Sequence, residues 1–212
     1  MVITNEGIGF IKITQGDLTV ALSPISKDSK HKGSQFGADV CLISVNHPDM
    51  NGVDAVTRKD KEPFVVRGPG EYEINDLFIE GFSSKTTYGG EERFNTLYTF
   101  ELDGIEIAYF GALGESDISP EIKEALGEID VLFIPIGGDG TLTAQEAYKL
   151  AVKRESAIIV PIMFGATGEK DALKAFLNES GNEGLKSVDK LTLKKKDIAG
   201  KQGEVIVLKP SL

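Results

Sequence analysis

The stretch Val40-Cys41-Leu42-Ile43-Ser44-Val45-Asn46-His47-Pro48-Asp49-Met50-Asn51-Gly52 decides the fold of this chain. It begins with an apolar run short enough for a buried β-strand. It ends in a polar turn that carries His47 and Asp49, two residue types found in metal and catalytic sites. A strand that delivers such residues at its carboxyl end is a common way to build a site. We therefore expect a central buried strand over residues 40–44, with a candidate site directly after it.

Short strands are also predicted on both sides of this stretch. Residues 9–14 alternate apolar and polar side chains, and residues 18–22 return after the turn Gln15-Gly16-Asp17. Further strands are expected at 64–66, 71–74, 77–82, 96–102 and 105–110. The dipeptides Asn75-Asp76 and Asp103-Gly104 predict two tight hairpin turns between them. The polar segments 27–37 and 83–95 predict surface loops.

The second half of the chain predicts alternating strands and helices. Ser119-Pro120 is a favourable helix start, and Thr143 with Glu146 forms a capping box. A third helix is expected around residues 173–177, ending at Gly181. The apolar runs 131–136 and 157–162 predict central buried strands, and residues 204–208 a final strand. Hairpins followed by strand–helix–strand units predict a layered α/β protein with mixed sheets, and no linker-like segment interrupts the single domain expected over residues 1–212.

Composition limits the classes of function. The 212 residues are 41% hydrophobic and 26% charged, as in an ordinary soluble protein, and the net charge of −10 argues against a broad nucleic-acid-binding surface. The lysine-rich segment 186–201 is interpreted as an edge strand protected by lysines. One cysteine, Cys41, permits no internal disulfide. With no signal peptide and no apolar run near the ~20 residues of a membrane span, we expect a cytoplasmic protein without a membrane partner.

The motifs together resemble the metallo-beta-lactamase superfamily, in its branch of small predicted metal-dependent hydrolases. Residues 44–50 resemble the Thr/Ser-His-x-His-x-Asp-His run that follows a strand in that family. Four further segments, in the family's order, resemble its Pro-Gly-x-Tyr, Gly-Asp-Leu-Gly, Pro-(Val/Ile)-Gly-Gly and Pro-Met-His-Tyr motifs: Gly68–Ile74, Gly111–Gly114, Pro135–Gly138 and Pro161–Phe164. The resemblance covers about residues 3–165. It implies a four-layer αββα sandwich with two mixed β-sheets and a site along one edge.

The same resemblance implies that most metal ligands have been replaced. The middle histidine and the aspartate of the first motif are retained as His47 and Asp49. The other family ligand positions carry residues that are not the family's His or Asp: Gly7, Ser23, Val45, Met50, Ala112 and Met163. Valine and alanine side chains offer no lone pair, and a methionine thioether is poorly suited to zinc in a site of nitrogen and oxygen donors. We expect Val45, Met50, Ala112 and Met163 to pack together as an apolar cluster.

The number of histidines leads to the same expectation without any resemblance. The chain has two, and His31 lies in a polar segment that we expect to be a solvated loop far from His47. A dinuclear site needs several histidines, so no metal cofactor is expected. The alternative is one zinc or other divalent ion held by His47, Asp49 and either Asp139 or Ser23. A simpler interpretation is that His47 and Asp49 only stabilise their turn through hydrogen bonds.

Three functions therefore remain as hypotheses. The first is a degenerate metallo-beta-lactamase-fold protein that has lost dinuclear zinc hydrolysis and binds an unidentified small molecule or protein. The alternative is a metal-dependent hydrolase with an altered mono-metal site around His47 and Asp49. The third, a nucleic-acid-binding module using residues 186–201, has the weakest support because the chain as a whole is acidic.

Overall fold

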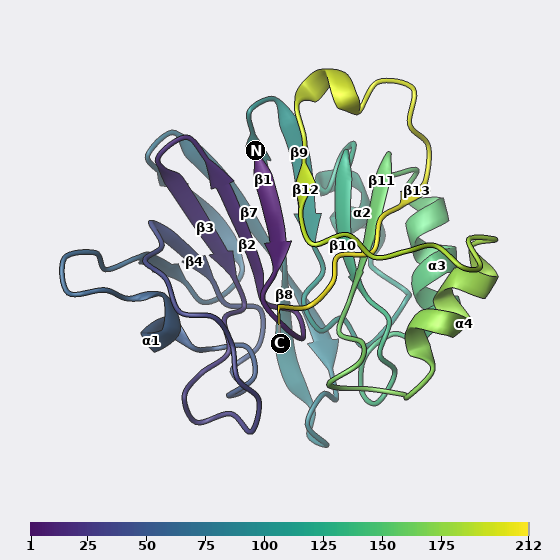
Figure 1. The fold of residues 1–212 in the computed structure, drawn as a ribbon, viewed down its shortest axis with the longest axis horizontal. Helices are drawn as coiled ribbons and strands as arrows, with labels where there is room; N and C mark the ends of the chain where they lie inside the picture. Colours follow the sequence, from purple (N-terminus) through teal and green to yellow (C-terminus); the bar gives the residue numbers. More distant parts are fainter. Residues whose placement is uncertain (212) are drawn as a thin grey trace.

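Two mixed β-sheets face each other in the computed structural model, which describes residues 1–211 (Figure 1). The first sheet has the order β12-β1-β2-β3-β4-β5. It is antiparallel from β12 to β3 and parallel from β3 to β5. The central stretch supplies β4, which lies between β3 and β5, as expected. The strands are β1 (Val2–Asn5), β2 (Ile11–Gln15), β3 (Leu18–Leu22), β4 (Val40–Leu42), β5 (Phe64–Val66) and β12 (Leu191–Thr192).

The second sheet has the order β13-β11-β10-β9-β8-β7-β6. It is antiparallel from β6 to β9 and parallel from β9 to β13. The apolar runs predicted as central strands are β10 and β11, and neither lies at an edge. The strands are β6 (Gly70–Ile74), β7 (Leu77–Thr86), β8 (Arg93–Leu102), β9 (Ile105–Tyr109), β10 (Val131–Pro135), β11 (Ile158–Ile162) and β13 (Glu204–Val205).

Helices complete the outer layers. Against the second sheet lie α2 (Pro120–Ala125), α3 (Ala144–Lys153) and α4 (Ala172–Glu179), and α3 starts with the predicted Thr143–Glu146 capping box. On the first sheet the outer layer is much thinner. It consists of α1 (Val53–Val56) and the chain beside it, from which Phe36 stacks on Phe10 at 5.5 Å between ring centroids. The lysine-rich segment contains the short 3-10 helix η1 (Lys195–Asp197).

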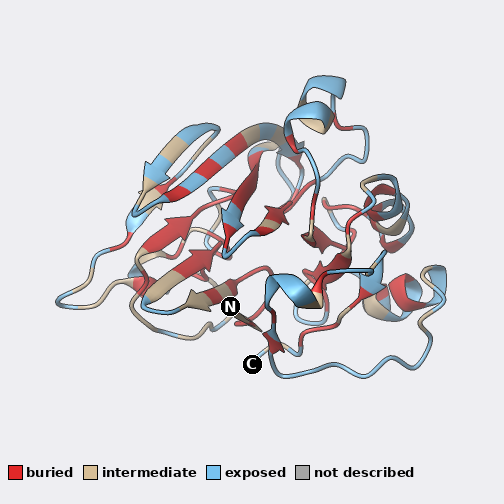
Figure 2. Ribbon diagram, turned by 90° about the horizontal axis from the view of Figure 1, so that it is seen from above, coloured by how far each residue is buried: buried red, intermediate tan, exposed pale blue. Residues whose placement is uncertain are grey.

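The core has two layers. In Figure 2 the buried residues lie mainly in the strands in the middle of the molecule. Side chains from both sheets form one cluster, and side chains from the second sheet and α2–α4 form the other. Phe133 belongs to the first cluster, whereas its neighbours Leu132 and Ile134 belong to the second. Successive residues of a strand point to opposite faces, so a strand buried on both faces has a continuous apolar sequence. Within residues 1–211, no helix is both long and apolar enough to cross a bilayer.

One prediction about strands was wrong, and one strand was missed. Residues 83–95, expected to be a loop, extend β7 and β8, so the connection shrinks to residues 87–92. Ser83 and Lys85 face solvent, whereas Thr86 and Asn95 are buried, and the backbone pairs from Ser83 with Thr96 to Thr86 with Arg93. Strand β1 was not predicted, because its four residues carry little pattern and it is held by pairing with β2 and β12. The hairpin turns were predicted correctly, and the positive φ values of Asn75 (50°) and Asp76 (62°) fit a type I′ turn.

Candidate functional site

The chain after β4 crosses from the first sheet toward the second. Val45 forms an isolated antiparallel bridge with Asn95 of β8, and Ser44 O accepts the backbone N–H of Thr96 at 2.9 Å. The two sheets are therefore joined directly at this edge. The following turn carries His47 and Asp49, so both residues lie at the edge of the sandwich where a site was predicted.

Asp49 is held by two hydroxyl groups. The Tyr88 hydroxyl donates to Asp49 Oδ2 at 2.7 Å, and the Ser29 hydroxyl donates to Oδ1. Tyr88 and Asp49 are each only 7% exposed. Burial, together with the neighbouring Asp49 carboxylate, raises the pKa of Tyr88 well above its ordinary value, so the phenol stays protonated as a donor. We call Ser29, Asp49 and Tyr88 the hydroxyl clamp, since hydroxyl protons satisfy the carboxylate oxygens here.

His47 is oriented by the same turn. Its Nδ1 accepts the backbone N–H of Asp49 at 3.2 Å and lies 3.5 Å from Asp49 Oδ2. An accepting Nδ1 places the ring proton of the neutral imidazole on Nε2. Burial lowers the pKa of His47, Asp49 acts to raise it, and Arg93 lowers it further. The His47 and Tyr88 rings pack in a T-shaped arrangement with 5.1 Å between their centroids. A Cβ added to Gly89 would lie 2.9 Å from His47 Nε2.

Four of the positions that the resemblance aligns with the family's metal ligands are buried. Val45, Met50, Ala112 and Met163 are each at most 1% exposed and belong to the cluster between the sheets. Their polar neighbours are paired among themselves. Ser23 and Ser44 hydroxyl oxygens lie 2.7 Å apart, and Ser44 Oγ lies 3.7 Å from Met50 Sδ.

Asn95 and Tyr109 extend this network. Asn95 Oδ1 accepts the backbone N–H of Ala112 at 2.9 Å, and the Tyr109 hydroxyl donates to the Gly9 carbonyl at 2.9 Å. A Cβ added to Gly9 would lie 3.1 Å from Tyr109 Oη and 3.5 Å from Met163 Cγ. The buried edge of the sandwich thus combines apolar contacts with neutral hydrogen bonds, and neither sequence nor motif had indicated Asn95 or Tyr109.

The backbone at this edge is unusual. Ile8, Ser23 and Met163 have φ values of 53°, 46° and 62°, in the left-handed region that β-branched and bulky residues rarely adopt. Such conformations cost on the order of 1–3 kcal/mol each and persist where the surrounding structure imposes them. The Met163 N–H donates to the Ile8 carbonyl at 2.9 Å, which ties two of these positions together. Gly7, beside Ile8, also has a positive φ of 116°.

A cleft of about 550 Å³ opens above the hydroxyl clamp. Its walls include Lys30, His31, His47, Tyr88 and Asp139. The expectation that His31 lies far from His47 was therefore wrong, because the loop after β3 folds back over the turn through Ser29. Among residues 1–211, no three His, Cys, Asp or Glu side chains converge as metal ligands would. Tyr88 and Ser29 were also missed, although an aromatic residue beside Gly89 and Gly90 in a polar segment was an available signal.

The layered sandwich and the site at its edge define a metallo-beta-lactamase fold. A family model described as "Beta-lactamase superfamily domain" matches residues 7–163, and the chain belongs to this family. A crystal structure of a candidate Zn-dependent hydrolase of the metallo-beta-lactamase superfamily from Thermotoga maritima is 26% identical, with a TM-score of 0.75 and coverage of 98% of this chain and 97% of that one.

Two further proteins are similar to this chain, one in fold at low identity and one in sequence over a short segment. The metallo-beta-lactamase fold protein YhfI of Bacillus subtilis shares the fold at 11% identity and a TM-score of 0.62, covering 100% of this chain and 98% of that one. A UPF0173 protein of Pyrococcus furiosus is 37% identical over 59 residues, which is 28% of this chain. That match also spans only 28% of the Pyrococcus protein.

Proposed function

We propose that this protein is a metallo-beta-lactamase-fold protein that has lost dinuclear zinc hydrolysis and now binds a small molecule or a protein partner. The hydroxyl clamp carries the proposal. A carboxylate that has lost its metal ion needs other partners where it is buried, and both oxygens of Asp49 accept hydrogen bonds, Oδ1 from Ser29 and Oδ2 from Tyr88. These two hydrogen bonds satisfy the buried carboxylate without a metal.

The remaining donor set does not fit two zinc ions. A hydrolytic zinc needs about three protein ligands and an open position for water. Val45 and Ala112 offer no donor, and Met50 and Met163 offer only buried thioethers. The serine hydroxyls of Ser23 and Ser44 are neutral and bonded to each other.

The alternative is a hydrolase with one metal ion near His47, Asp49 and Asp139. One observation favours it: both histidines of the chain line the same cleft as these two aspartates. In that case the ion uses the lone pairs of Asp49 that the Ser29 and Tyr88 hydroxyls leave free.

Zinc binding distinguishes the two functions. We expect purified protein to contain no stoichiometric zinc, iron or manganese by elemental analysis, and added zinc to leave its thermal midpoint unchanged. A tightly bound ion at a hundredfold excess over its Kd adds about 2.7 kcal/mol to the free energy of unfolding, which a melt detects easily. Near one metal per chain, lost in both His47→Ala and Asp49→Ala but kept in Lys30→Ala, would establish the alternative.

Restoring the family ligands provides the converse test. The quadruple variant Val45→His, Met50→His, Ala112→Asp and Met163→His places polar groups in a buried cluster, so we expect a less stable metal-free protein. We expect zinc to recover part of that loss, and more of it when Gly7→His and Ser23→Asp are added. A quadruple variant with unchanged stability and no zinc response contradicts the correspondence of these positions with metal ligands.

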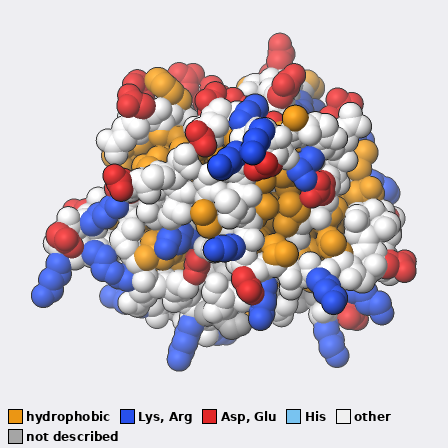
Figure 3. Space-filling view, turned by 45° about the horizontal axis from the view of Figure 1, so that its top comes forward, with side chains coloured by type: hydrophobic (Ala, Val, Ile, Leu, Met, Phe, Trp, Pro, Cys, Tyr) orange, Lys and Arg blue, Asp and Glu red, His pale blue; other side chains and the backbone are white. Residues whose placement is uncertain are grey.

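The proposal includes a single domain over residues 1–212 in the cytoplasm. Burial raises the pKa of Cys41 to about 12, so its thiol is a packing group and not a nucleophile. Nucleic acid is not the proposed partner. Lysines of the basic segment pair with carboxylates, Lys195 with Asp130 at 2.7 Å and Lys201 with Glu204. Figure 3 shows basic, acidic and apolar side chains interspersed on one face of the molecule.

A further inference from the structure

A second cleft, of about 620 Å³, lies on the other side of the chain that leaves β4. One wall is the connection from β5 to β6, residues 67–69, where the chain passes from the first sheet to the second. Ile43, directly after β4, and Thr96 of β8 line it and are each 4% exposed. The volume falls in the range of about 300–1,000 Å³ that is usual for small-molecule sites.

The charge of this cleft is opposite to that of the chain. Arg67 is its only ionisable lining residue, in a protein whose net charge is −10. No salt bridge or side-chain hydrogen bond within residues 1–211 engages the Arg67 guanidinium. An arginine offers a planar fork of donors suited to a carboxylate or a similar anion. The free fork beside a hollow therefore favours a ligand with one anionic group.

The remainder of the lining favours an apolar body on that ligand. Phe94 lines the cleft and is 78% exposed, although burying a phenylalanine side chain away from water is favourable. An aromatic ring beside an arginine suits a flat, apolar molecule, which can stack on the ring while its acid group meets the guanidinium.

Tyrosine hydroxyls and close backbone packing hold the walls of the cleft in place. The Tyr72 hydroxyl lies 3.1 Å from the Gly68 carbonyl oxygen and 3.2 Å from that of Pro69, and the Tyr98 hydroxyl donates to the Ile43 carbonyl at 2.8 Å. A Cβ added to Gly81 would lie 2.9 Å from the Gly68 oxygen, so the crossover packs directly on β7. A fixed cleft reduces the entropy lost when a ligand binds.

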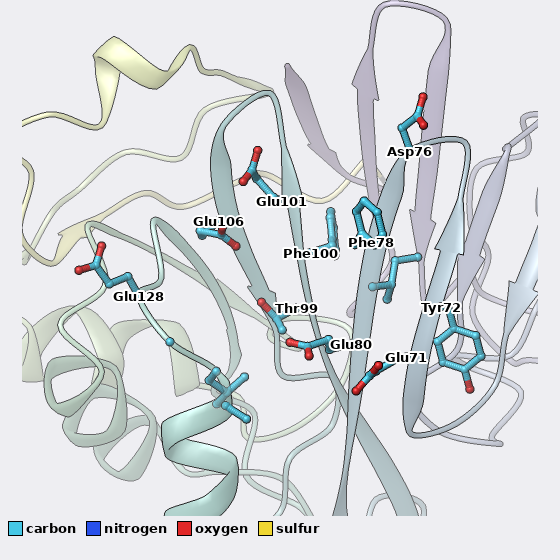
Figure 4. Close-up of a pocket in the computed structure, with 14 residues that line it drawn as sticks. Glu71, Tyr72, Asp76, Phe78, Glu80, Thr99, Phe100, Glu101, Glu106 and Glu128 are labelled. Atoms are coloured by element: carbon cyan, nitrogen blue, oxygen red, sulfur yellow. The ribbon is translucent and has the colours of Figure 1, made fainter.

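A second hollow, which is lined by acidic residues, provides a comparison. On the outer face of β6–β9, Phe78 is also exposed, at 64%, but it is surrounded by carboxylates (Figure 4). Glu71, Glu80, Glu101 and Glu106 line that hollow together with Phe78, and no basic residue does. Exposed phenylalanine alone therefore does not define an anion site, whereas Phe94 together with Arg67 does.

We propose that the Arg67–Phe94 cleft binds a small molecule with a flat apolar body and a single carboxylate. This site is separate from the cleft above the hydroxyl clamp, and it does not depend on whether zinc chemistry was lost. Arg67 pairs with the carboxylate, Phe94 covers the apolar body, and Ile43 forms part of the floor.

Naphthalene carboxylate is a suitable probe, with naphthalene carboxamide as its uncharged counterpart. The chain has no tryptophan, so the fluorescence anisotropy of the probe is measured with little protein background. We expect saturable binding of the carboxylate, weakened by salt because the pairing is electrostatic. Arg67→Gln should weaken it at least about tenfold, the lower limit for a charged hydrogen bond, and should leave binding of the carboxamide nearly unchanged.

Matched variants identify the cleft. Phe94→Ser should weaken both probes, and Phe78→Ser, which removes another exposed ring from the acidic hollow, should weaken neither. Because Arg67, Phe94 and Phe78 are all exposed, we expect the variants to keep the wild-type melting midpoint. Equal carboxylate affinity in wild type and Arg67→Gln, loss of binding in Phe78→Ser, or no saturable binding to wild type would each overturn the proposal. Zinc content and zinc-dependent stability test the proposed function separately.

Discussion

Removing one hydroxyl from the hydroxyl clamp should destabilise the protein measurably. In Tyr88→Phe, the ring and its edge contact with His47 remain, and only the 2.7 Å hydrogen bond to Asp49 Oδ2 is lost. A hydrogen bond to a charged group contributes about 1.5–3 kcal/mol, and here both partners are buried. We therefore expect the free energy of unfolding to fall by about 2 kcal/mol. For a chain of this size that is a decrease of roughly 4–8 °C in Tm.

Urea denaturation followed by circular dichroism measures this loss, and an unchanged m-value shows that the same surface unfolds. Tyr148→Phe is the matched control, because Tyr148 packs edge-on against Phe176 at 6.0 Å and none of the side-chain hydrogen bonds within residues 1–211 involves its hydroxyl. That variant should change the free energy of unfolding by less than about 0.5 kcal/mol. If Tyr88→Phe behaves like Tyr148→Phe, the hydrogen bond from Tyr88 to Asp49 does not stabilise the fold. If zinc then stabilises Tyr88→Phe but not wild type, the clamp is what excludes the metal.

Two other predictions concern His47. Burial lowers its pKa from the ordinary 6.5, so the unfolded chain binds more protons between that value and the lowered one. The His47 contribution to stability should therefore be complete above about pH 6.5 and be lost as the pH falls through the lowered pKa. Chemical denaturation across this range should show a shallower pH dependence for His47→Gln than for the wild type. Gly89→Ala should cost more than Gly90→Ala in the same assay. Both glycines have positive φ (78° and 83°), but only a Cβ at Gly89 meets His47, at 2.9 Å from Nε2, whereas one at Gly90 meets nothing within 4 Å. Equal losses in the two variants contradict the described packing of Gly89 on His47.

The sequence predicted those elements whose signals are local. Thr143 and Glu146 cap α3 because their side chains reach backbone groups three residues away. The strand β10 has an unbroken apolar sequence because both of its faces are buried. Asp103-Gly104 forms the turn between β8 and β9 because both residues adopt positive φ. These features depend on a few neighbouring residues and are visible without a structure.

The features that were missed depend on contacts between distant residues. Tyr88 meets Asp49 across 39 positions, and Asn95 reaches the Ala112 N–H across 17. Residues 83–86 have the polar composition of a loop, but their backbone is ordered by pairing with β8. His31 was placed far from the site because nothing in its own segment indicates that Ser29 binds Asp49. The sequence predicted a candidate site after β4, and the structure was needed to find which side chains contact His47 and Asp49 there.

The pairing of β1 with β12 has a consequence for the order in which the chain folds during synthesis. Val2 lies opposite Thr192 and Ile3 opposite Leu191. A strand that is synthesised first can therefore pair only after a strand near the end of the chain has been synthesised. Asn5 is bridged in the same way to Pro210. Because a ribosome adds roughly 5–20 residues per second, the amino-terminal sheet keeps an unpaired edge for about 10 seconds or more. That open edge is a template for pairing with another nascent chain. Dependence on a chaperone should therefore be greatest while residues 6–190 are already exposed and β12 is not.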